Sequence, residues 1–324
     1  MAKVFSGIQP TGIVHIGNYL GAVKNWVKLQ NEHDCIFSIV DLHSLTIPYE
    51  PKSLNQRVLD ALATNIAAGL DPEKSSIFVQ SLVPEHTELS WLLTTITPVG
   101  NLERMTQYKE KSEKQGLLAG LLCYPILMAA DILLYKAELV PVGEDQLQHL
   151  EITRVIARKF NSTFGEYFPE PLPNLTKATR VMALNDPTCK MSKSISGSYI
   201  ALTDSPEEIT NKVKRAVTAS DVDGKMSPGV ANLFTLLEAF APQDVYQKFM
   251  KDFNTGTLKF SELKPALAEA IITELTPIRE KRTELLAKPK ILEEIVEAGT
   301  KRAKKEASEN MREIKELMGL KLHF

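Results

Sequence analysis

Three short apolar runs near the N-terminus constrain the fold more than any other feature of this sequence. They cover residues 4–8, 35–40 and 76–80, and none shows the polar alternation of a half-exposed strand. A glycine turn and an apolar helical pattern follow the first run, and a second helical pattern covers residues 53–69. Continuous apolar strands separated by helices are typical of a parallel sheet covered on both faces. The N-terminal part is therefore predicted to be an α/β domain.

The remainder of the chain is predicted to be mostly helical. Residues 85–160 carry helical patterns, interrupted at residues 139–143 by a candidate fourth strand, and residues 161–189 are proline-rich and irregular. From residue 205 onward one helical pattern follows another. Residues 291–320 place apolar side chains at three- and four-residue steps, which predicts one apolar face on a long final helix.

The composition excludes several classes of protein. The three cysteines lie far apart, without the spacing of a disulfide framework or a zinc site, so we expect no protein-held metal. No run of about 18 apolar residues predicts a membrane span. The N-terminus lacks the apolar region of a secretory signal, so we expect a cytoplasmic protein with no membrane partner. A net charge of −2 argues against a general nucleic-acid coat protein.

A glycine-containing turn follows the first strand, in the place where open parallel sheets collect their ligands. It reads Thr-Gly-Ile-Val-His-Ile-Gly-Asn at residues 11–18. Gly12 and Gly17 allow a phosphate or adenine to approach the backbone, and the helix that begins near His15 offers unpaired N–H groups. His15 can add a positive donor as charge develops. For this string alone, an ordinary turn with an incidental histidine is an equal alternative.

A second string, Lys-Met-Ser-Lys-Ser at residues 190–194, places two cations and two hydroxyls around one apolar anchor. Two ammonium groups on a loop suit a reaction in which negative charge builds up on a leaving pyrophosphate. For an arbitrary pair of lysines a solvated loop is the commoner explanation. The pairing with the string at residues 11–18 favours a shared nucleotide site.

The two strings resemble the HIGH and KMSKS signatures of class I aminoacyl-tRNA synthetases, and the whole chain resembles their bacterial tryptophanyl branch. The similarity includes the runs at residues 103–112, 127–135 and 140–146, of which the last two separate the tryptophan branch from its tyrosine-activating sibling. The resemblance implies a Rossmann-like parallel sheet with a helical insertion and an all-helical C-terminal domain.

The resemblance also implies a division into domains and a group of partners. A catalytic domain would cover residues 1–186, with a helical insertion at about 103–172 that supplies the contact of a homodimer. A helical anticodon-binding domain would cover residues 187–290, and the helix at 291–324 would pack back on the catalytic domain. The implied partners are L-tryptophan, tRNA(Trp) and a second copy of the chain.

ATP, with Mg²⁺ held through its phosphates, is the nucleotide that the resemblance implies. His15, Lys190 and Lys193 would meet the negative charge that develops during the reaction. Lys111 would reach the ATP phosphates. Besides Lys190 and Lys193, the implied ATP-binding residues are Gln9, Pro10, Thr11, Gly17, Asn18, Gly143, Glu144, Asp145, Val181, Met191, Ser192 and Ser194.

Asp131 lies in an otherwise apolar helical run, and a buried carboxylate needs a partner. The pattern alone favours a helix-end or side-chain hydrogen bond, whereas the resemblance implies that Asp131 accepts the indole N–H of tryptophan. A site built around that bond rejects phenylalanine, because its acceptor would be left unsatisfied. The other residues implied to bind tryptophan are Phe5, Val40, Tyr124, Met128 and Gln146.

Two positions depart from the common signatures. Asn18 stands where class I enzymes often have histidine, as is usual in the tryptophan branch, and Ile195 follows the lysine string where the family more often has aspartate. The histidines outside the first string, among them His43, His86 and His149, have no ligand-like spacing and are interpreted as ordinary surface or packing residues.

The expected reaction begins with attack of the tryptophan carboxylate on the α-phosphate of ATP, which gives tryptophanyl-adenylate and pyrophosphate. The 2′-hydroxyl of the terminal adenosine of tRNA then takes the tryptophanyl group. Three alternatives stay open: the tyrosine-activating sibling, a small-molecule nucleotidylyltransferase, and a non-catalytic paralogue that binds tRNA or a nucleotide.

Overall fold

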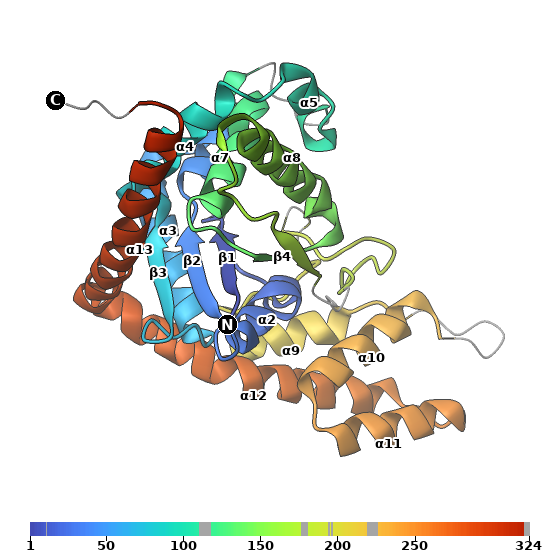
Figure 1. The fold of residues 1–324 in the computed structure, drawn as a ribbon. Coiled ribbons are helices and arrows are strands. Elements are labelled where there is room, and N and C mark those ends of the chain that lie inside the picture. The colour runs from blue at the N-terminus through green and yellow to red at the C-terminus, as the bar shows by residue number, and fades with distance from the viewer. Residues whose placement is uncertain are drawn as a thin grey trace. The chain divides into compact units, whose positions relative to one another are not determined.

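The structure is a computed structural model that describes residues 1–10, 12–109, 118–175, 181–193, 195, 197–218 and 226–320 (Figure 1). The chain forms two compact units. The first comprises Met1–Gly12, Trp26–Thr176 and Leu285–Phe324, and the second comprises Ile13–Asn25 and Lys177–Glu284. Most of the glycine-turn signature therefore belongs to the same unit as the lysine string.

A parallel sheet forms the centre of the first unit. Its strands are β1 (Lys3–Ile8), β2 (Asp34–Ile39), β3 (Ser75–Val79), β4 (Leu139–Val142) and β5 (Leu172–Leu175), in the order β3-β2-β1-β4-β5. Every pairing is parallel, and β1 aligns with β2 from Lys3 opposite Asp34 to Ile8 opposite Ile39. The prediction of an α/β fold with a parallel sheet is confirmed.

Strand β5 corrects the prediction of irregular structure for residues 161–189. It pairs with β4 from Leu172 to Leu175, and Pro173 lies within it. Proline is tolerated here because β5 is the edge strand, so that no further strand needs the backbone donor that proline lacks.

Helices of the first unit follow strands β2, β3 and β4 and cover the apolar sheet. They are α3 (Pro51–Ala67), α4 (Glu85–Thr94), α5 (Val99–Glu103), α7 (Ala119–Leu133), α8 (Leu147–Phe164) and α13 (Pro289–Leu317). Short 3-10 turns occupy Leu42–Thr46, Gln80–Leu82 and Glu144–Gln146. Helix α3 ends where predicted, because Gly69 takes a φ of +116°, a backbone conformation that favours glycine.

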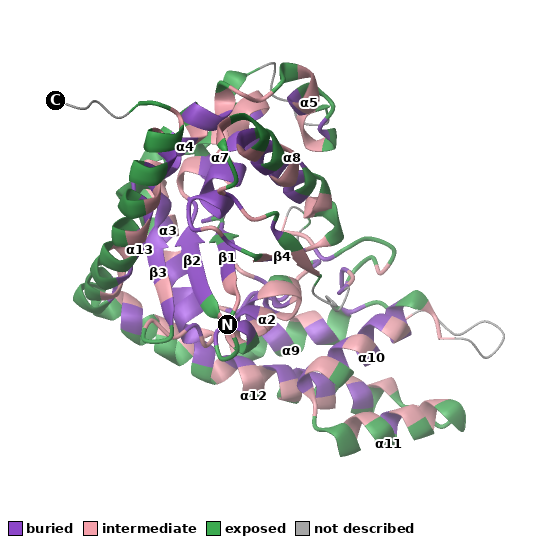
Figure 2. Ribbon diagram, viewed as in Figure 1, coloured by how far each residue is buried: buried purple, intermediate pink, exposed green. Residues whose placement is uncertain are grey.

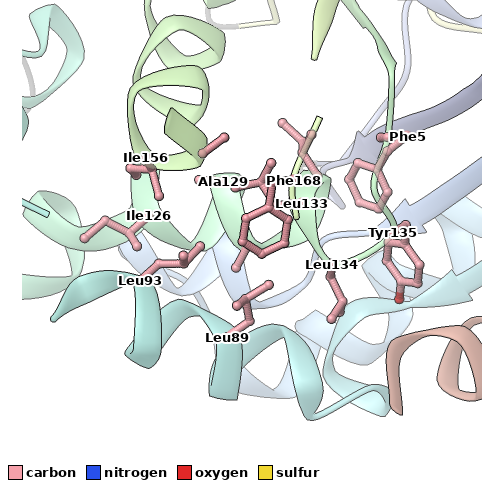
Figure 3. Packing of buried hydrophobic residues seen from close by; sticks show 14 of the residues in the cluster. Phe5, Leu89, Leu93, Ile126, Ala129, Leu133, Leu134, Tyr135, Ile156 and Phe168 are labelled. Carbon is pink, nitrogen blue, oxygen red and sulfur yellow. The ribbon is translucent and has the colours of Figure 1, made fainter. Parts of the chain in front are cut away.

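The main core of the first unit gathers around α7 (Figure 2). Leu133, Leu134 and Tyr135 at the end of this helix are fully buried. The Tyr135 ring stacks on Phe5 of β1 with centroids 5.8 Å apart and an interplanar angle of 9° (Figure 3). A rigid aromatic stack therefore joins the first strand to the end of α7.

Helix α13 packs along β3, the other edge strand of the sheet (Figure 1). Gly299 permits this approach, because a Cβ at that position would lie 1.9 Å from the carbonyl oxygen of Ile77. Arg302 donates from its guanidinium to the carbonyl oxygens of Pro72 and Ser75 at 2.8 and 3.0 Å. The helix thus covers a strand edge that would otherwise be open to pairing with another chain.

The second unit is helical. It contains α1 (Ile16–Asn18), the π-helical turn Tyr19–Val23, α9 (Pro206–Arg215), α10 (Pro228–Phe240), α11 (Gln243–Asn254) and most of α12 (Phe260–Ala287); α2 (Lys24–Leu29) begins in it. Glu274 of α12 accepts a hydrogen bond from the Tyr19 hydroxyl at 2.8 Å and pairs with Lys24 at 2.9 Å. These contacts explain why residues 13–25 belong with the C-terminal helices.

None of the helices within the described residues is both long enough and apolar enough to cross a membrane.

Candidate active site

Several site residues of the first unit lie at the carboxyl ends of the parallel strands. Gln9 follows β1, Val40 follows β2, Gln80 follows β3 and Gly143 follows β4. Because the strands are parallel, these positions share one edge of the sheet, where ligands of such sheets bind. Gln9 is exposed at this edge, whereas Val40 and Gln80 are buried.

A fully buried carboxylate, Asp131 of α7, is the centre of a hydrogen-bond network. Its Oδ1 accepts hydrogen bonds from Gln80 Nε2 and His86 Nδ1, both at 2.7 Å. Its Oδ2 accepts a hydrogen bond from His43 Nε2 at 2.8 Å. The pattern-based expectation that Asp131 has side-chain partners is confirmed, while its bond to an indole stays a prediction.

The network keeps Asp131 ionised. Burial alone would raise the pKa of the carboxyl, but the hydrogen bonds from His43 and His86 outweigh this effect and hold the pKa below its ordinary value. Since an ionised carboxylate can only accept hydrogen bonds, the facing nitrogen atoms of Gln80 and both histidines must be donors. Asp131 therefore presents fixed acceptor positions at neutral pH.

His43 and His86, interpreted from the sequence as surface or packing residues, are both buried. Both bond Asp131, and His86 also contacts the Tyr135 hydroxyl through Nε2 at 2.9 Å. Gln80 carries no sequence motif. The signal that could have found all three residues is position, because Gln80 directly follows β3, His43 lies four residues beyond the end of β2, and His86 lies seven residues beyond the end of β3.

Helix α7 presents three predicted tryptophan-site residues on one face. Tyr124, Met128 and Asp131 are spaced by four and three residues, which brings their side chains to the same side of a helix. The Tyr124 hydroxyl donates to Gln107 Oε1 at 3.1 Å and contacts His149 Nε2, and burial raises its pKa to about 12. The hydroxyl therefore stays protonated and can act as a donor.

Two more predicted tryptophan-site residues are buried. Phe5 and Val40 are 3% and 5% exposed, and their contact with tryptophan stays a prediction. Gly7 leaves room for Val40, because a Cβ on Gly7 would lie 3.0 Å from Val40 Cγ1. Gln146, by contrast, is partly exposed and donates to Asp145 Oδ2 at 3.4 Å.

In the second unit, His15 is the N-cap of helix α1, as the sequence predicts. The Asn18 backbone N–H donates to His15 Nδ1, and the His15 N–H donates to Asn18 Oδ1, each at 3.3 Å. A Cβ on Gly17 would lie 3.0 Å from the imidazole ring. Glycine and asparagine at these positions therefore fix the ring with Nδ1 as acceptor, which leaves the proton on Nε2.

The stretch that follows the lysine string pairs with the backbone around His15. The Ile16 N–H donates to the Ile200 carbonyl oxygen, and the Leu202 N–H donates to the Val14 carbonyl oxygen, each at 3.0 Å. The Tyr199 ring lies 6.0 Å from the imidazole, centroid to centroid. The two signatures, distant in sequence, are therefore joined within one unit by a short backbone clamp.

Asp204 holds the far end of this clamp. Its Oδ2 accepts the Ala201 N–H at 2.8 Å and a hydrogen bond from the Lys212 ammonium. Arg279 of α12 donates to the Asp204 carbonyl oxygen at 2.9 Å. No sequence motif marks this acid.

The lysine string runs beside a second short pairing. Lys190 forms an antiparallel bridge with Met182, and the Met191 N–H donates to the Val181 carbonyl oxygen at 3.1 Å. Met191 is only 4% exposed, as expected of an apolar anchor, whereas Lys190 is exposed. Burial lowers the pKa of Lys193.

The charge of His15 differs from the expectation of a positive donor. Burial, followed by the repulsion of Lys193 and Lys190, lowers its pKa from 6.5 to about 4. The ring is therefore neutral at physiological pH, and its Nε2–H is a neutral hydrogen-bond donor. The cationic character of this region comes from the lysines.

Three predicted site residues, Thr11, Lys111 and Ser194, lie outside the described residues. Of the other predicted ATP-binding residues, Glu144 and Asp145 are exposed and Pro10 is buried. Across the part of the chain that the structure describes, no group of three or more histidine, cysteine, aspartate or glutamate side chains could hold a metal ion.

The chain is similar to one known family over almost its full length. Residues 1–276 match the family described as tRNA synthetases class I (W and Y). The tryptophan–tRNA ligase of Clostridium tetani is 46% identical over 98% of this chain and 96% of its own length. This chain belongs to the tryptophanyl-tRNA synthetase family. The tryptophan–tRNA ligase of Caldanaerobacter subterraneus is 45% identical over 99% of each chain, so the match extends over the full length.

Solved structures of the tryptophanyl-tRNA synthetase family share the fold. The Campylobacter jejuni tryptophanyl-tRNA synthetase complexed with ADP and tryptophan superimposes with a TM-score of 0.87 at 37% identity, covering 98% of this chain and 100% of that one. The tyrosyl-tRNA synthetase of Archaeoglobus fulgidus, at 20% identity and a TM-score of 0.68, shares the fold alone. The Rossmann-like class I fold predicted from the sequence is confirmed.

Proposed function

We propose that this chain ligates L-tryptophan to tRNA(Trp) through a tryptophanyl-adenylate, releasing pyrophosphate and then AMP. The observation that carries the proposal is the full-length similarity to tryptophan–tRNA ligases. The chain also retains a clamped His15 and both lysines of the lysine string. A non-catalytic paralogue would have no need to keep these groups in a defined arrangement.

In the first step, the tryptophan carboxylate attacks the α-phosphate of ATP and pyrophosphate leaves. No side-chain nucleophile is required, so the protein contributes placement and charge stabilisation. His15 donates a neutral hydrogen bond from Nε2 to a phosphate oxygen, and Lys190 and Lys193 supply positive charge. A neutral imidazole is well suited to this place, because a third cation would repel both lysines before the nucleotide binds.

Tryptophan recognition rests on Asp131. The carboxylate accepts the indole N–H, Phe5, Val40 and Met128 shape the ring site, and Tyr124 with Gln146 receives the substrate ammonium. Support for the ring site comes from the shared face of α7 and the burial of Phe5 and Val40.

The remaining parts of the proposal concern nucleotide and partners. ATP binds with Mg²⁺ held through its phosphates, which adds positive charge without protein ligands to the ion. Residues 187–290 bind the anticodon region of tRNA, residues 103–172 supply a homodimer contact, and the enzyme works in the cytoplasm. In the second step the 2′-hydroxyl of the terminal adenosine attacks the mixed anhydride.

Aminoacylation of a tRNA(Trp) transcript with radiolabelled tryptophan tests the proposal. We expect ATP-dependent incorporation of label into acid-precipitable tRNA, and none with His15→Ala combined with Lys193→Ala. Adenylate formation without transfer to tRNA would overturn the ligase assignment, and a lack of both would overturn the enzyme assignment.

A further inference from the structure

The buried partners of Asp131 form a hydrogen-bonded chain that reaches Tyr135 through His86. Because the carboxylate only accepts, His86 Nδ1 carries a proton and donates it to Oδ1. Its other ring nitrogen, Nε2, contacts the Tyr135 hydroxyl at 2.9 Å. Burial raises the pKa of Tyr135, so the hydroxyl keeps its proton. Tyr135 thereby fixes the orientation of the His86 ring, which in turn fixes the acid.

The contacts within the described residues leave one acceptor position of the Asp131 carboxylate unused. A carboxylate offers about four lone-pair positions, two on each oxygen. Gln80 and His86 use both positions of Oδ1, and His43 uses one position of Oδ2. The remaining acceptor position therefore lies on Oδ2, beside His43, and one further donor would complete the site.

The orientation of the Gln80 side chain satisfies the Asp131 carboxylate at the expense of the amide itself. Its Nε2 faces Asp131, while its buried Oε1 has no hydrogen-bond partner within the described residues. A buried acceptor without a partner is unfavourable, and a residue placed for stability alone would not keep one. The orientation is required because only the NH₂ group can face an ionised carboxylate.

We propose that Gln80 and His86, with Tyr135 behind His86, are positioning residues that restrict Asp131 to a single open acceptor position. As a result, the amino-acid site selects for an aromatic ring that carries a hydrogen-bond donor. This inference rests on the proposed function and deepens it. Without these donors the carboxylate can rotate or take up a proton, and either change relaxes the requirement for an N–H group. A ring of the same shape without the donor would then be accepted more readily.

The test compares two amino acids of nearly equal shape, tryptophan and 3-benzothienylalanine, in which sulfur replaces the indole N–H. ATP–pyrophosphate exchange gives kcat/KM for each amino acid, and the ratio of the two values reports the demand for a donor. We expect His86→Leu and Gln80→Met each to lower this ratio at least about tenfold, in line with the loss of a hydrogen bond to a charged group. Tyr135→Phe lowers the ratio by a smaller factor.

A conservative variant and a matched control variant separate a positioning role of His86 from a general loss of structure. His86→Asn retains an N–H near the place of Nδ1 and should recover most of the lost ratio. Tyr167→Phe removes a hydroxyl that bonds Glu313 at 2.9 Å, away from Asp131, and should leave the ratio unchanged. Should His86→Leu fail to fold, as judged by circular dichroism, Tyr135→Phe and Gln80→Met decide the question alone.

Equal losses for both amino acids in the folded variants would overturn the inference, since a structural role lowers both values of kcat/KM together. An unchanged ratio would overturn it as well. If the unmodified enzyme fails to activate tryptophan, the proposed function is at fault instead, so the two failures are distinguishable.

Discussion

The buried acid of the first unit and the lysine string of the second unit differ in how their charges are held. Asp131 is completely buried, and three side chains from outside its own helix donate hydrogen bonds to it before any ligand binds. Lys190 is exposed and Lys193 is only partly buried, beside an imidazole that their charge helps to keep neutral. Selective recognition of a ring needs an acceptor fixed before binding, whereas charge stabilisation needs cations that act when the negative charge appears.

The largest expected effect comes from removing the preorganised acid. Asp131→Ala leaves the buried donors of His43, Gln80 and His86 without their acceptor. We expect the free energy of unfolding to fall by about 3–5 kcal/mol, which urea denaturation can measure. Glu309→Ala, at an exposed acid of α13, is the matched control and should change stability by less than about 0.5 kcal/mol.

Lys193→Ala tests the other side of the comparison. We expect adenylate formation to slow at least about a hundredfold, because losing one charge contact in the transition state costs about 3–4 kcal/mol. Tryptophan affinity and the urea midpoint should change little, since this cation is partly exposed. Single-turnover kinetics measures the rate, and Lys214→Ala, at an exposed lysine of the same unit, is the control. An unchanged rate would remove Lys193 from the mechanism.

Asp204→Asn probes the clamp between the two signatures. The substitution weakens the bonds to the Ala201 N–H and the Lys212 ammonium, so we expect about a tenfold loss in the rate of adenylate formation. The loss should appear with saturating tryptophan and leave the KM for tryptophan unchanged. An equal effect on the KM for tryptophan would show that the two regions are not energetically separate.

Acid unfolding should separate the two regions by pH. The pKa of His15 is about 4 when folded and 6.5 as its ordinary value, so the unfolded state binds the proton first. Stability is therefore lost as pH falls from 6.5 to about 4. The pKa of Asp131 lies below its ordinary 3.8, so its contribution is kept above that pH and lost below it.

His15→Asn should reduce the pH dependence of the urea midpoint between pH 6.5 and 4 relative to the unmodified protein. His33→Asn, in the other unit, should leave this pH dependence unchanged. This is the smallest of the expected effects. A slope that persists in His15→Asn would show that another group titrates there.

Strands β1 to β4 could be predicted from the sequence because they are continuous apolar runs. Such runs can be recognised without knowing which strands lie beside them. Strand β5 was missed because Pro171 and Pro173 resemble loop residues. Pro173 is tolerated within the strand because β5 lies at the edge of the sheet. That position in the sheet is a property of the whole fold and has no local signal.

The candidate site shows the same limit. Asp131 could be selected because a carboxylate in an apolar helix needs a partner, but the partners themselves come from 45 to 88 residues away. The neutral state of His15 depends on burial and on lysines that are distant in sequence. The amino-acid sequence gives the residue types, whereas protonation states and hydrogen-bond directions depend on how the folded chain packs.

Amino-acid-dependent ATP–pyrophosphate exchange, with tryptophan and tyrosine measured side by side on the purified protein, tests the account most directly. The account predicts rapid exchange with tryptophan and a kcat/KM for tyrosine at least about a hundredfold lower, since shape and a fixed acceptor act together. Equal exchange with both amino acids, or faster exchange with tyrosine, would contradict it.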